Sequence, residues 1–327
     1  MRSAHRILVA VAWTSVACVT PANELTDTSL TASGDEDSET PTQDGETIDR
    51  PSWEPVKVAT LNVQRFFDTT CDSGTCGPDA FEPVVSADQF EAKARAVSLA
   101  IESMDAEFVL LQEIESQACL DAVQARLGGR YTVAVLGEIG VPASVDVAVL
   151  AEGTLLEVVL HRQTEIPRPD GGTTLFSREL PEVHVQRAGR RVILMPLHFR
   201  SKYNDDPDRR LAEAQAARAI VANVAATYPD AMILLGGDVN DFPGSPPMNA
   251  LEADDTLDAV YDDLPAHERW THEYKGQQAM IDHLFIANDS GGQLVAGSTR
   301  VLREDGGGLA GSDHAAVIAT VAPVIAQ

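Results

Sequence analysis

The sequence predicts an α+β domain in which two packed mixed sheets bury their strands and carry helices on their outer faces. Apolar runs of strand length outnumber the helical patterns, which excludes a helical bundle. Strands and helices do not alternate strictly, which argues against a doubly wound sheet. The chain has 327 residues and a hydrophobic content of 44%, so it can bury a substantial core.

The first half of this domain is predicted to mix strands and helices irregularly. The expected strands are apolar and rich in β-branched residues, and the helices space their apolar side chains three or four residues apart. Ser86 or Asp88 would cap the first helix. The predicted elements are strands at Val56–Leu61, Glu107–Leu111, Tyr131–Leu136 and Val145–Leu150, and helices at Asp88–Met104 and Ala118–Leu127.

The second half is predicted to contain one long helix among several strands. The helix is rich in alanine, and the strands are flanked by residues that favour turns. An apolar run at Ile233–Leu235 indicates a further buried strand. The other predicted elements are strands at Glu182–Gln186, Arg191–Leu197, Ala279–Ala287 and Ala315–Val321, and a helix at Asp208–Ala226.

The Ile233–Leu235 strand ends in a segment that suits a metal site. Gly236 and Gly237 allow the backbone to turn and to approach a ligand closely. If the extended geometry continues, Asp238 and Asn240 project from the same face, and a carboxylate beside a neutral oxygen ligand suits Mg²⁺. On this segment alone, a strand that ends in an Asx turn is an equal alternative.

Polar residues follow other predicted strands in the same way. Asn62, Glu113 and His198 each lie at or just beyond the end of an apolar run. Because a rigid sheet can aim side chains from several strand ends at one point, an active site is expected there. Glu113 follows mostly apolar residues, where an unpaired carboxylate would be costly, so a ligand role is favoured.

Six short motifs occur in order along the chain, and they are Thr60-Leu61-Asn62-Val63, Leu111-Gln112-Glu113, Leu197-His198-Phe199-Arg200-Ser201-Lys202, Gly236-Gly237-Asp238-Val239-Asn240, Ile281-Asp282-His283 and Gly311-Ser312-Asp313-His314. They resemble the motifs of the endonuclease/exonuclease/phosphatase superfamily, which includes pancreatic deoxyribonuclease, apurinic endonucleases, neutral sphingomyelinases and inositol phosphatases. The resemblance covers residues 56–321. The segment at 209–215 is similar to a helix of bacterial extracellular nucleases.

The resemblance implies a four-layer α/β/β/α sandwich and metal-dependent phosphoester hydrolysis. The implied ion is Mg²⁺ or Mn²⁺, with Ca²⁺ as a structural or co-activating ion. Glu113 would be the main metal carboxylate, Asn62 would support it, and Asp313 would complete the metal side. Asp238 and Asn240 would position the attacking water or a second ion.

The resemblance also implies catalytic and phosphate-binding residues. His198 and His314 would be the two catalytic histidines, with Asp282 orienting His314. Glu138 lies where deoxyribonuclease-like members place a carboxylate that orients the other histidine. Arg178 resembles the arginine with which the same members contact phosphate.

Phosphodiester hydrolysis requires these residue types on chemical grounds as well. In-line attack needs an activated water, neutralised phosphate oxygens and a protonated leaving oxygen. A carboxylate-bound cation supplies charge and lowers the pKa of water. Histidine can act as acid or base near neutral pH, and a guanidinium matches phosphate oxygens. The histidines outside the motifs are expected to be structural or exposed, and they are His161, His184, His267 and His272.

The N-terminus is expected to direct export. Arg2 and Arg6 precede an uncharged, mostly apolar stretch that is short for a membrane span and typical of a signal peptide at residues 1–19. The stretch ends in Ser15-Val16-Ala17-Cys18, which resembles a bacterial lipoprotein cleavage box except at Ser15. Lipidation of Cys18 and simple secretion therefore both stay open.

Residues 20–52 are acidic, rich in Ser and Thr, and almost free of large apolar side chains. Such a segment cannot bury enough surface to offset its ordering entropy, so we expect a disordered tether ahead of a catalytic domain at 53–327. In that domain Cys71 and Cys76 flank a polar loop, and a disulfide between them is favoured because export permits oxidation.

The charge of the chain limits its functions. The formal net charge is −26, and residues 1–52, with three basic and nine acidic side chains, contribute −6, which leaves −20 on the domain. This argues against a nucleic-acid coat protein, but an enzyme with a local basic patch and metal ions is compatible with it. Four basic residues lie close together in the sequence, and they are Arg200, Lys202, Arg209 and Arg210. A phosphate-contact surface and exposed charges at the start of a helix are equally good interpretations of them.

The sequence thus predicts an exported, monomeric, metal-dependent phosphodiesterase of bacterial type, with nucleic acid as the leading substrate. It would be either secreted or a cell-envelope lipoprotein associated with the membrane through Cys18. A phospholipid phosphoesterase of the sphingomyelinase kind, or a sugar-phosphate phosphoesterase, is the second hypothesis. A non-catalytic surface-binding protein is a more remote third.

Overall fold

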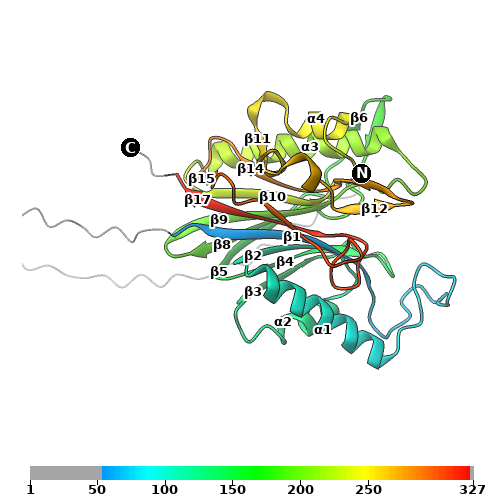
Figure 1. Cartoon of the computed structure of the whole chain (residues 1–327). Helices are drawn as coiled ribbons and strands as arrows, with labels where there is room; N and C mark the ends of the chain where they lie inside the picture. Colours follow the sequence, from blue (N-terminus) through cyan, green and yellow to red (C-terminus); the bar gives the residue numbers. More distant parts are fainter. Residues whose placement is uncertain (1–53, 325–327) are drawn as a thin grey trace, which may run out of the picture. The chain divides into compact units, whose positions relative to one another are not determined.

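Two β-sheets lie face to face, with helices on both outer sides (Figure 1). The computed structural model describes residues 54–324. The expected signal peptide and tether at 1–52 lie outside these residues. No helix in the described range is long and apolar enough to cross a membrane.

The first sheet has strand order β15-β17-β1-β2-β4-β3, and β16 pairs with β17. It is mixed, because β1 runs parallel to β2 and antiparallel to β17. Its strands are β1 (Val56–Phe66), β2 (Phe108–Ile114), β3 (Val133–Gly137), β4 (Asp146–Ala151), β15 (Gly292–Leu294), β16 (Arg300–Leu302) and β17 (Ala316–Pro323).

The second sheet has strand order β11-β14-β10-β9-β8-β5. It is also mixed, because β10 runs parallel to β9 and antiparallel to β14. Its strands are β5 (Thr154–Leu160), β8 (Pro181–Arg187), β9 (Arg190–His198), β10 (Met232–Asp238), β11 (Leu257–Ala259) and β14 (Asp282–Ala287). Two small hairpins stand apart from the sheets, formed by β6 (Ile166–Arg168) with β7 (Gly172–Thr174), and by β12 (His272–Tyr274) with β13 (Gln277–Ala279).

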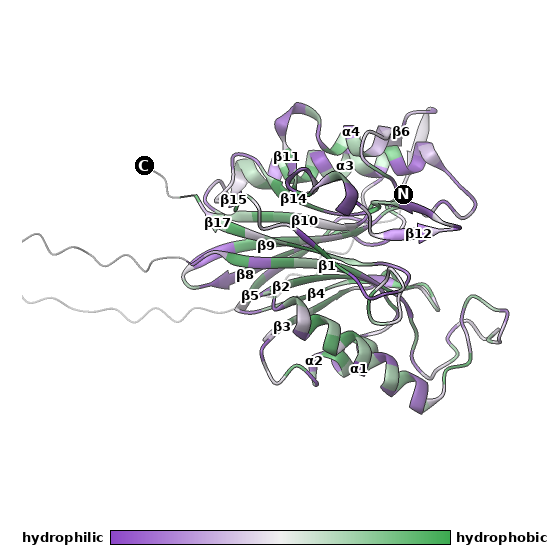
Figure 2. Ribbon diagram, viewed as in Figure 1, coloured by the Kyte–Doolittle hydropathy of each residue, from purple (hydrophilic) through white to green (hydrophobic). Residues whose placement is uncertain are grey.

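The helices cover the outer faces of the two sheets (Figure 1). Buried residues of α1 pack in one cluster with the outer side chains of β1 and β2, while buried alanines and valines of α3 pack with β10. Figure 2 shows apolar residues along the central strands and hydrophilic residues in the loops. The helices are α1 (Ala87–Met104), α2 (Gln117–Gln124), α3 (Pro207–Thr227) and α4 (Pro246–Leu251), with short 3₁₀ turns at Ala253–Asp255, Val260–Asp263 and Ala266–Glu268.

The predicted fold class is confirmed, and so are the main elements except the strand predicted at Ala279–Ala287. That strand begins only at Asp282, and Ala279 ends the short strand β13. The first helix begins at Ser86, whose side chain accepts a hydrogen bond from Gln89 N, and Gln89 closes a capping box. The edge strand β5 was not predicted. Its side chains are mostly exposed on both faces, so it shows no alternation of apolar and polar residues.

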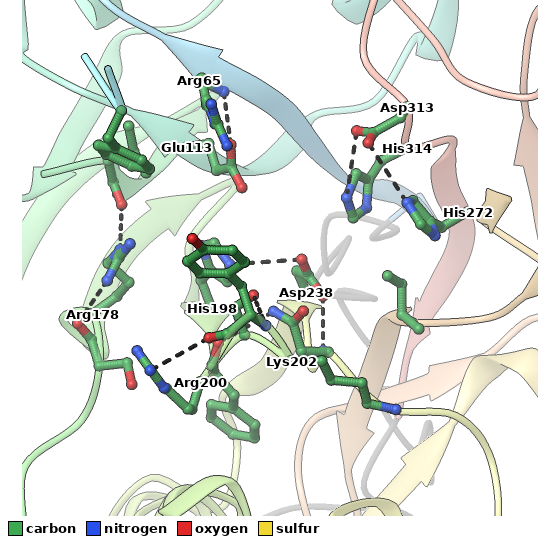
Figure 3. A pocket seen from close by; sticks show the side chains of 18 of the residues that line it. Arg65, Glu113, Arg178, His198, Arg200, Lys202, Asp238, His272, Asp313 and His314 are labelled. Atoms are coloured by element: carbon green, nitrogen blue, oxygen red, sulfur yellow. Dashed lines mark hydrogen bonds and ion pairs between the residues drawn. The ribbon is translucent and has the colours of Figure 1, made fainter. Parts of the chain in front are cut away.

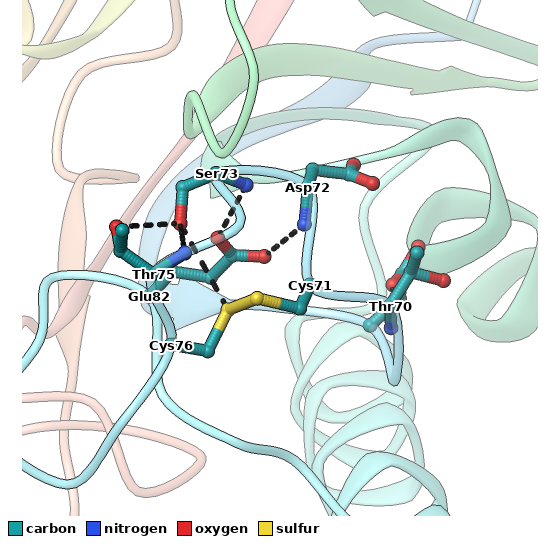
Figure 4. Close-up of a disulfide and its surroundings, with 8 residues drawn as sticks. Thr70, Cys71, Asp72, Ser73, Thr75, Cys76 and Glu82 are labelled. Carbon is teal, nitrogen blue, oxygen red and sulfur yellow. Dashed lines mark hydrogen bonds between the residues drawn. A yellow bond between two sulfur atoms is a disulfide. The ribbon is translucent and has the colours of Figure 1, made fainter.

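The Cys71–Cys76 disulfide favoured by the sequence is present in the loop between β1 and α1 (Figure 4). The buried carboxylate of Glu82 holds the same loop, accepting hydrogen bonds from the backbone nitrogens of Asp72 at 2.6 Å and Ser73 at 2.8 Å. Cys119 is the remaining cysteine of the described residues and is buried with a free thiol.

Gly237 allows the backbone of β10 to approach the backbone of β9 closely, next to the expected metal site at Asp238. Its φ is +148°, and a Cβ there would lie only 1.9 Å from the carbonyl oxygen of Leu197. A second obstacle would be the side chain of Gln112 from the other sheet, at 3.0 Å. Only glycine therefore lets the strands reach this register just before Asp238.

We expect Gly237→Ala to lower the free energy of unfolding by about 3 kcal/mol or more, because backbone atoms rather than a flexible side chain block the methyl group. Urea denaturation would measure the change. Gly306→Ala is the matched control, since a Cβ at Gly306 would meet no atom within 4 Å. Equal stability of the two variants would contradict this account of the β9–β10 contact.

Candidate functional site

The ends of β1, β2, β9 and β10 open into a cavity of about 920 Å³ (Figure 3). Strand register brings the polar residues there together. In the second sheet, Asp238 is paired with His198 of β9 on one side and with Asp282 of β14 on the other. In the first sheet, Asn62 of β1 is paired with Gln112, immediately before Glu113.

Asn62 joins the two sheets at the centre of the site. Its side-chain nitrogen donates to Glu113 Oε1 at 3.2 Å and to Asp238 Oδ2 at 3.1 Å, and the residue is fully buried. Glu113 adopts a φ of +67° where the β2–β4 register breaks, and its other oxygen accepts a hydrogen bond from Arg65 N at 2.7 Å. Two carboxylates are thus held on either side of one amide.

His314 forms a buried pair with Asp282. Nδ1 of His314 lies 2.8 Å from Asp282 Oδ2, and the second oxygen of Asp282 is buried with no hydrogen-bond partner in the described part of the chain. Burial opposes the charged imidazolium, but the Asp282 carboxylate outweighs it and raises the pKa of His314 to about 10. Burial together with the charge of Asp282 also raises the pKa of Asp238, to about 7.

His198 has the opposite electrostatic surroundings. Burial and the nearby positive charges of Arg178 and His314 hold its pKa well below the usual value, so the ring is neutral at pH 7. Its Nε2 lies 3.6 Å from Asp238 Oδ2. Its Nδ1 is buried and has no hydrogen-bond partner among the described residues.

Asn240 follows Asp238 in a tight turn with a φ of +56°. Its backbone nitrogen donates to Asp238 Oδ1 at 2.8 Å, and its side chain donates to the Phe199 carbonyl at 3.2 Å. The turn is therefore the Asx turn considered above, and it also brings Asn240 to the cavity wall. The Asx turn is thus confirmed, and a role for Asn240 in positioning water or an ion stays a prediction.

Arg178 lies in the cavity wall as the sequence predicts, while Glu138 does not approach His198. Arg178 donates to the carbonyl oxygens of Val145 and Ser177. Glu138 is exposed at the end of β3 and accepts a hydrogen bond from Gly140 N at 3.0 Å. Its carboxylate thus turns onto its own loop, and no contact with His198 occurs within the described residues.

His272 and Arg65 are among the cavity residues to which the sequence assigned no site role. His272, expected to be structural or exposed, lines the cavity, and its Nε2 lies 3.6 Å from Asp313 Oδ2. Figure 3 shows it on the same wall as His314. Arg65 lines the opposite part, beside Glu113. Neither residue lies in a motif, so only the fold reveals them.

Glu213 is a further residue that the sequence did not reveal. It sits fully buried in α3 and accepts hydrogen bonds from the backbone nitrogens of Ser177 at 2.6 Å and Arg200 at 2.7 Å. Burial raises its pKa. One carboxylate therefore ties together the two loops that place Arg178 and Arg200 in the cavity wall.

The four basic residues between 200 and 210 divide between two roles. Arg200 and Lys202 line the cavity. Arg209 donates to the Leu175 carbonyl, and Arg210 is buried with its guanidinium 2.9 Å from Asp241. Two of the four could therefore meet a phosphate, and the other two hold the loops.

The donor set of the cavity suits a hard divalent cation. Carboxylate oxygens of Glu113 and Asp238 lie on either side of the Asn62 amide nitrogen, and carboxylate oxygens are ligands that Mg²⁺ prefers. The Asn62 side-chain oxygen instead accepts a hydrogen bond from Gln64 N at 3.0 Å. Asp313 is half-exposed at the cavity wall, which leaves its oxygens accessible. His272, Asp313 and His314 also place ligand atoms within 4.8 Å of one another, as do Asp238, Asp282 and His314.

The sequence matches a protein-family model described as the Endonuclease/Exonuclease/phosphatase family over residues 57–303. No curated protein sequence matches the chain. The matched range contains most of the residues that line the cavity, from Arg65 to Ile281.

Solved structures share the fold at low sequence identity. The endonuclease/exonuclease/phosphatase from Bacteroides vulgatus has a TM-score of 0.61 and 15% identity, covering 83% of this chain and 100% of its own. D. rerio TDP2 complexed with single strand DNA product has a TM-score of 0.57 and 16% identity, covering 82% and 99%. The human Nocturnin catalytic domain with bound sulfate anion has a TM-score of 0.56 and 13% identity, covering 83% and 95%.

We expect Glu213→Ala to lower the free energy of unfolding by about 2–5 kcal/mol, because two buried backbone N–H groups lose their acceptor. Hydrogen exchange should accelerate at the amides of Ser177 and Arg200. Glu213→Gln, which keeps one acceptor oxygen, should give an intermediate effect. Unchanged exchange at both amides would show that Glu213 does not hold the two loops.

Proposed function

Because the chain belongs to the endonuclease/exonuclease/phosphatase family, whose members hydrolyse phosphoester bonds, we propose that it is a metal-dependent phosphodiesterase that acts on nucleic acid. The observation that carries this proposal is the convergence of Asn62, Glu113 and Asp238 with the Asp282–His314 pair in one cavity. Carboxylates, an amide and differently charged histidines are what phosphodiester hydrolysis requires.

Members of the family generally use divalent metal ions, and we propose Mg²⁺ or Mn²⁺ here. Glu113 and Asp313 would hold the ion, with Asn62 fixing the orientation of Glu113 through its hydrogen bond. A bound divalent cation neutralises charge on the phosphate oxygens and lowers the pKa of water.

The side chains of the chain supply proton transfer and positioning. His314, charged at neutral pH and held by Asp282, can donate a proton or stabilise negative charge on the phosphate. Asp238, whose pKa of about 7 lies near the working pH, can accept a proton from water that Asn240 helps to position. Neutral His198 is close enough to Asp238 to share this task.

Arginine and lysine side chains supply phosphate recognition. Arg178, Arg200, Lys202 and Arg65 all line the cavity. A guanidinium can donate two parallel hydrogen bonds to phosphate oxygens. These charges stand out in a domain with net charge −20, and the structural relative TDP2 has been solved with single strand DNA. The charges suit any phosphate ligand, and the likeness to TDP2 favours nucleic acid over a sugar phosphate.

We expect the protein to hydrolyse DNA or RNA with Mg²⁺ or Mn²⁺ and to lose this activity in EDTA. The substrate panel should include plasmid DNA, RNA, sphingomyelin and inositol phosphates, with Mg²⁺, Mn²⁺ or Ca²⁺. Hydrolysis of sphingomyelin but not of nucleic acid would replace the proposal by a lipid phosphoesterase. If no substrate is cleaved with any metal, the enzymatic proposal fails.

His198→Ala and His314→Ala should each lower kcat by at least about 100-fold, because each removes a group that transfers a proton or stabilises charge. Steady-state kinetics on the preferred substrate would measure this. His267→Ala is the matched control, because His267 is exposed and does not line the cavity. Equal rates for all three variants would remove both cavity histidines from the mechanism.

We also propose that the protein is exported, with lipidation of Cys18 or simple secretion as the two forms. The Cys71–Cys76 disulfide supports export, because such bonds persist in oxidising compartments. Mass spectrometry of the mature N-terminus from a bacterial host should find the signal removed. A lipid mass on the wild type that is lost in Cys18→Ser would identify the lipoprotein, and a chain retained intact in the cytoplasm would contradict export.

A further inference from the structure

Exposed aromatic side chains gather at one place in the described part of the chain. Its exposed Phe and Tyr residues are Phe81, Tyr203, Phe242 and Tyr274. Three of them line the cavity, and Phe242 lies beside Lys202, which also lines it. Aromatic residues make up only 5% of the sequence, so their concentration around one opening needs a reason. We call these four residues the aromatic rim.

The aromatic rim is built from four separate segments of the chain. Phe81 belongs to the loop between β1 and α1 that also contains the disulfide, and Tyr203 lies between β9 and α3. Phe242 lies between β10 and α4, and Tyr274 is the last residue of β12. Packing within any single segment therefore cannot account for the arrangement. Tyr203 and Tyr274 are 82% and 63% exposed, so they contribute little to the core.

Cations lie against three rings of the aromatic rim. The Arg65 guanidinium is 5.0 Å from the centre of the Phe81 ring, and the Lys275 ammonium is 4.9 Å from that of Tyr274. Lys202 is 4.7 Å from the Phe242 ring. Aromatic rings that alternate with positive charges can bind a flexible chain that carries both negative charges and planar groups.

We propose, building on the phosphodiesterase function above, that the aromatic rim stacks the unpaired bases of a single-stranded nucleic acid whose phosphate enters the cavity. Every base presents a π-face to an aromatic side chain, so such contacts tolerate any sequence. The cations beside the rings would meet the phosphates between successive bases.

A duplex fits the aromatic rim less well than a single strand. In a duplex the base faces are covered by neighbouring bases, and only ends, loops or separated strands expose them. A lipid surface also fits less well, because membrane-binding segments insert a continuous apolar face. Here the cavity wall next to the rings carries charged residues such as Asp79 and Arg200.

The loops that carry the rim are held in place before any ligand binds. Phe81 packs edge to face on Phe67 at 5.7 Å between ring centres, and the Cys71–Cys76 disulfide lies in the chain between these two residues. The loop of Tyr203 is held by Arg200, whose guanidinium donates to the carbonyl oxygen of Asn204 at 2.9 Å. Such pre-organisation lowers the entropic cost of binding.

Fluorescence anisotropy in EDTA tests this proposal directly, because binding is then measured without hydrolysis. We expect a labelled single strand to bind more tightly than a blunt duplex of the same sequence. Tyr203→Ala and Tyr274→Ala should each weaken single-strand binding by about 5- to 100-fold, as expected for the loss of one base stack. Tyr203→Trp and Tyr274→Trp, which keep a ring, should restore it.

Leu155→Ala is the control, since Leu155 is exposed on β5 and does not line the cavity. It should bind the single strand as the wild type does, and circular dichroism should show that all variants fold. Equal affinity for duplex and single strand, or unchanged binding in both alanine variants, would overturn the aromatic-rim proposal. Should the wild type still hydrolyse nucleic acid with Mg²⁺ in that case, the phosphodiesterase function would stand without the rim.

A lipid ligand would give a different pattern. Sphingomyelin vesicles would then bind the wild type, and Tyr203→Ala and Tyr274→Ala would each abolish that binding. If single strands also bind all variants equally, the rim recognises a membrane surface and the proposal is wrong. If no metal supports hydrolysis of any phosphodiester, the phosphodiesterase function fails separately, because the EDTA binding measurement does not depend on turnover.

Discussion

The hydrogen bonds of the Asn62 side chain are the interaction on which the rest of the site depends. Its amide nitrogen reaches Glu113 in its own sheet and Asp238 in the facing sheet, so one buried group spans the interface between the two layers. Among the residues that the structure describes, no other side chain donates a hydrogen bond to both carboxylates. Two acidic groups this close would otherwise repel each other, and a shared donor offsets part of that cost. The active centre is therefore a property of the sheet packing as much as of its loops.

The two cavity histidines show how environment separates chemically identical groups. Asp282 stabilises the imidazolium of His314, whereas His198 faces positive charge and burial without a carboxylate at its Nδ1. At neutral pH one ring is thus a cation and the other a neutral base. Pairs of titratable groups with pKa values displaced in opposite directions are the arrangement that acid–base chemistry needs.

The sequence predicted the parts of the site that lie on strand ends, because a buried strand followed by a polar residue is a local pattern. Asp238, His198 and Glu113 belong to this class. Residues whose position depends on distant packing were not predicted. Glu213 looks like one more polar residue of an alanine-rich helix until the fold brings two loops against it. Glu138 depends on packing in the same way, since the resemblance implies that it orients a histidine, whereas in the structure its carboxylate accepts a hydrogen bond from Gly140 N of its own loop.

The exposed edge strand β5 connects the strongly acidic composition with self-association of the protein. Leu155, Leu156, Val158 and Leu160 are exposed on a strand whose outer edge is unpaired among the described residues, and such edges can add a strand from another molecule. A net charge of −26 opposes such pairing between copies of the chain, and Glu157 places a charge within the strand itself. Because salt screens this repulsion, the same edge becomes accessible to self-association as ionic strength rises or as the pH approaches the isoelectric point near 4.5.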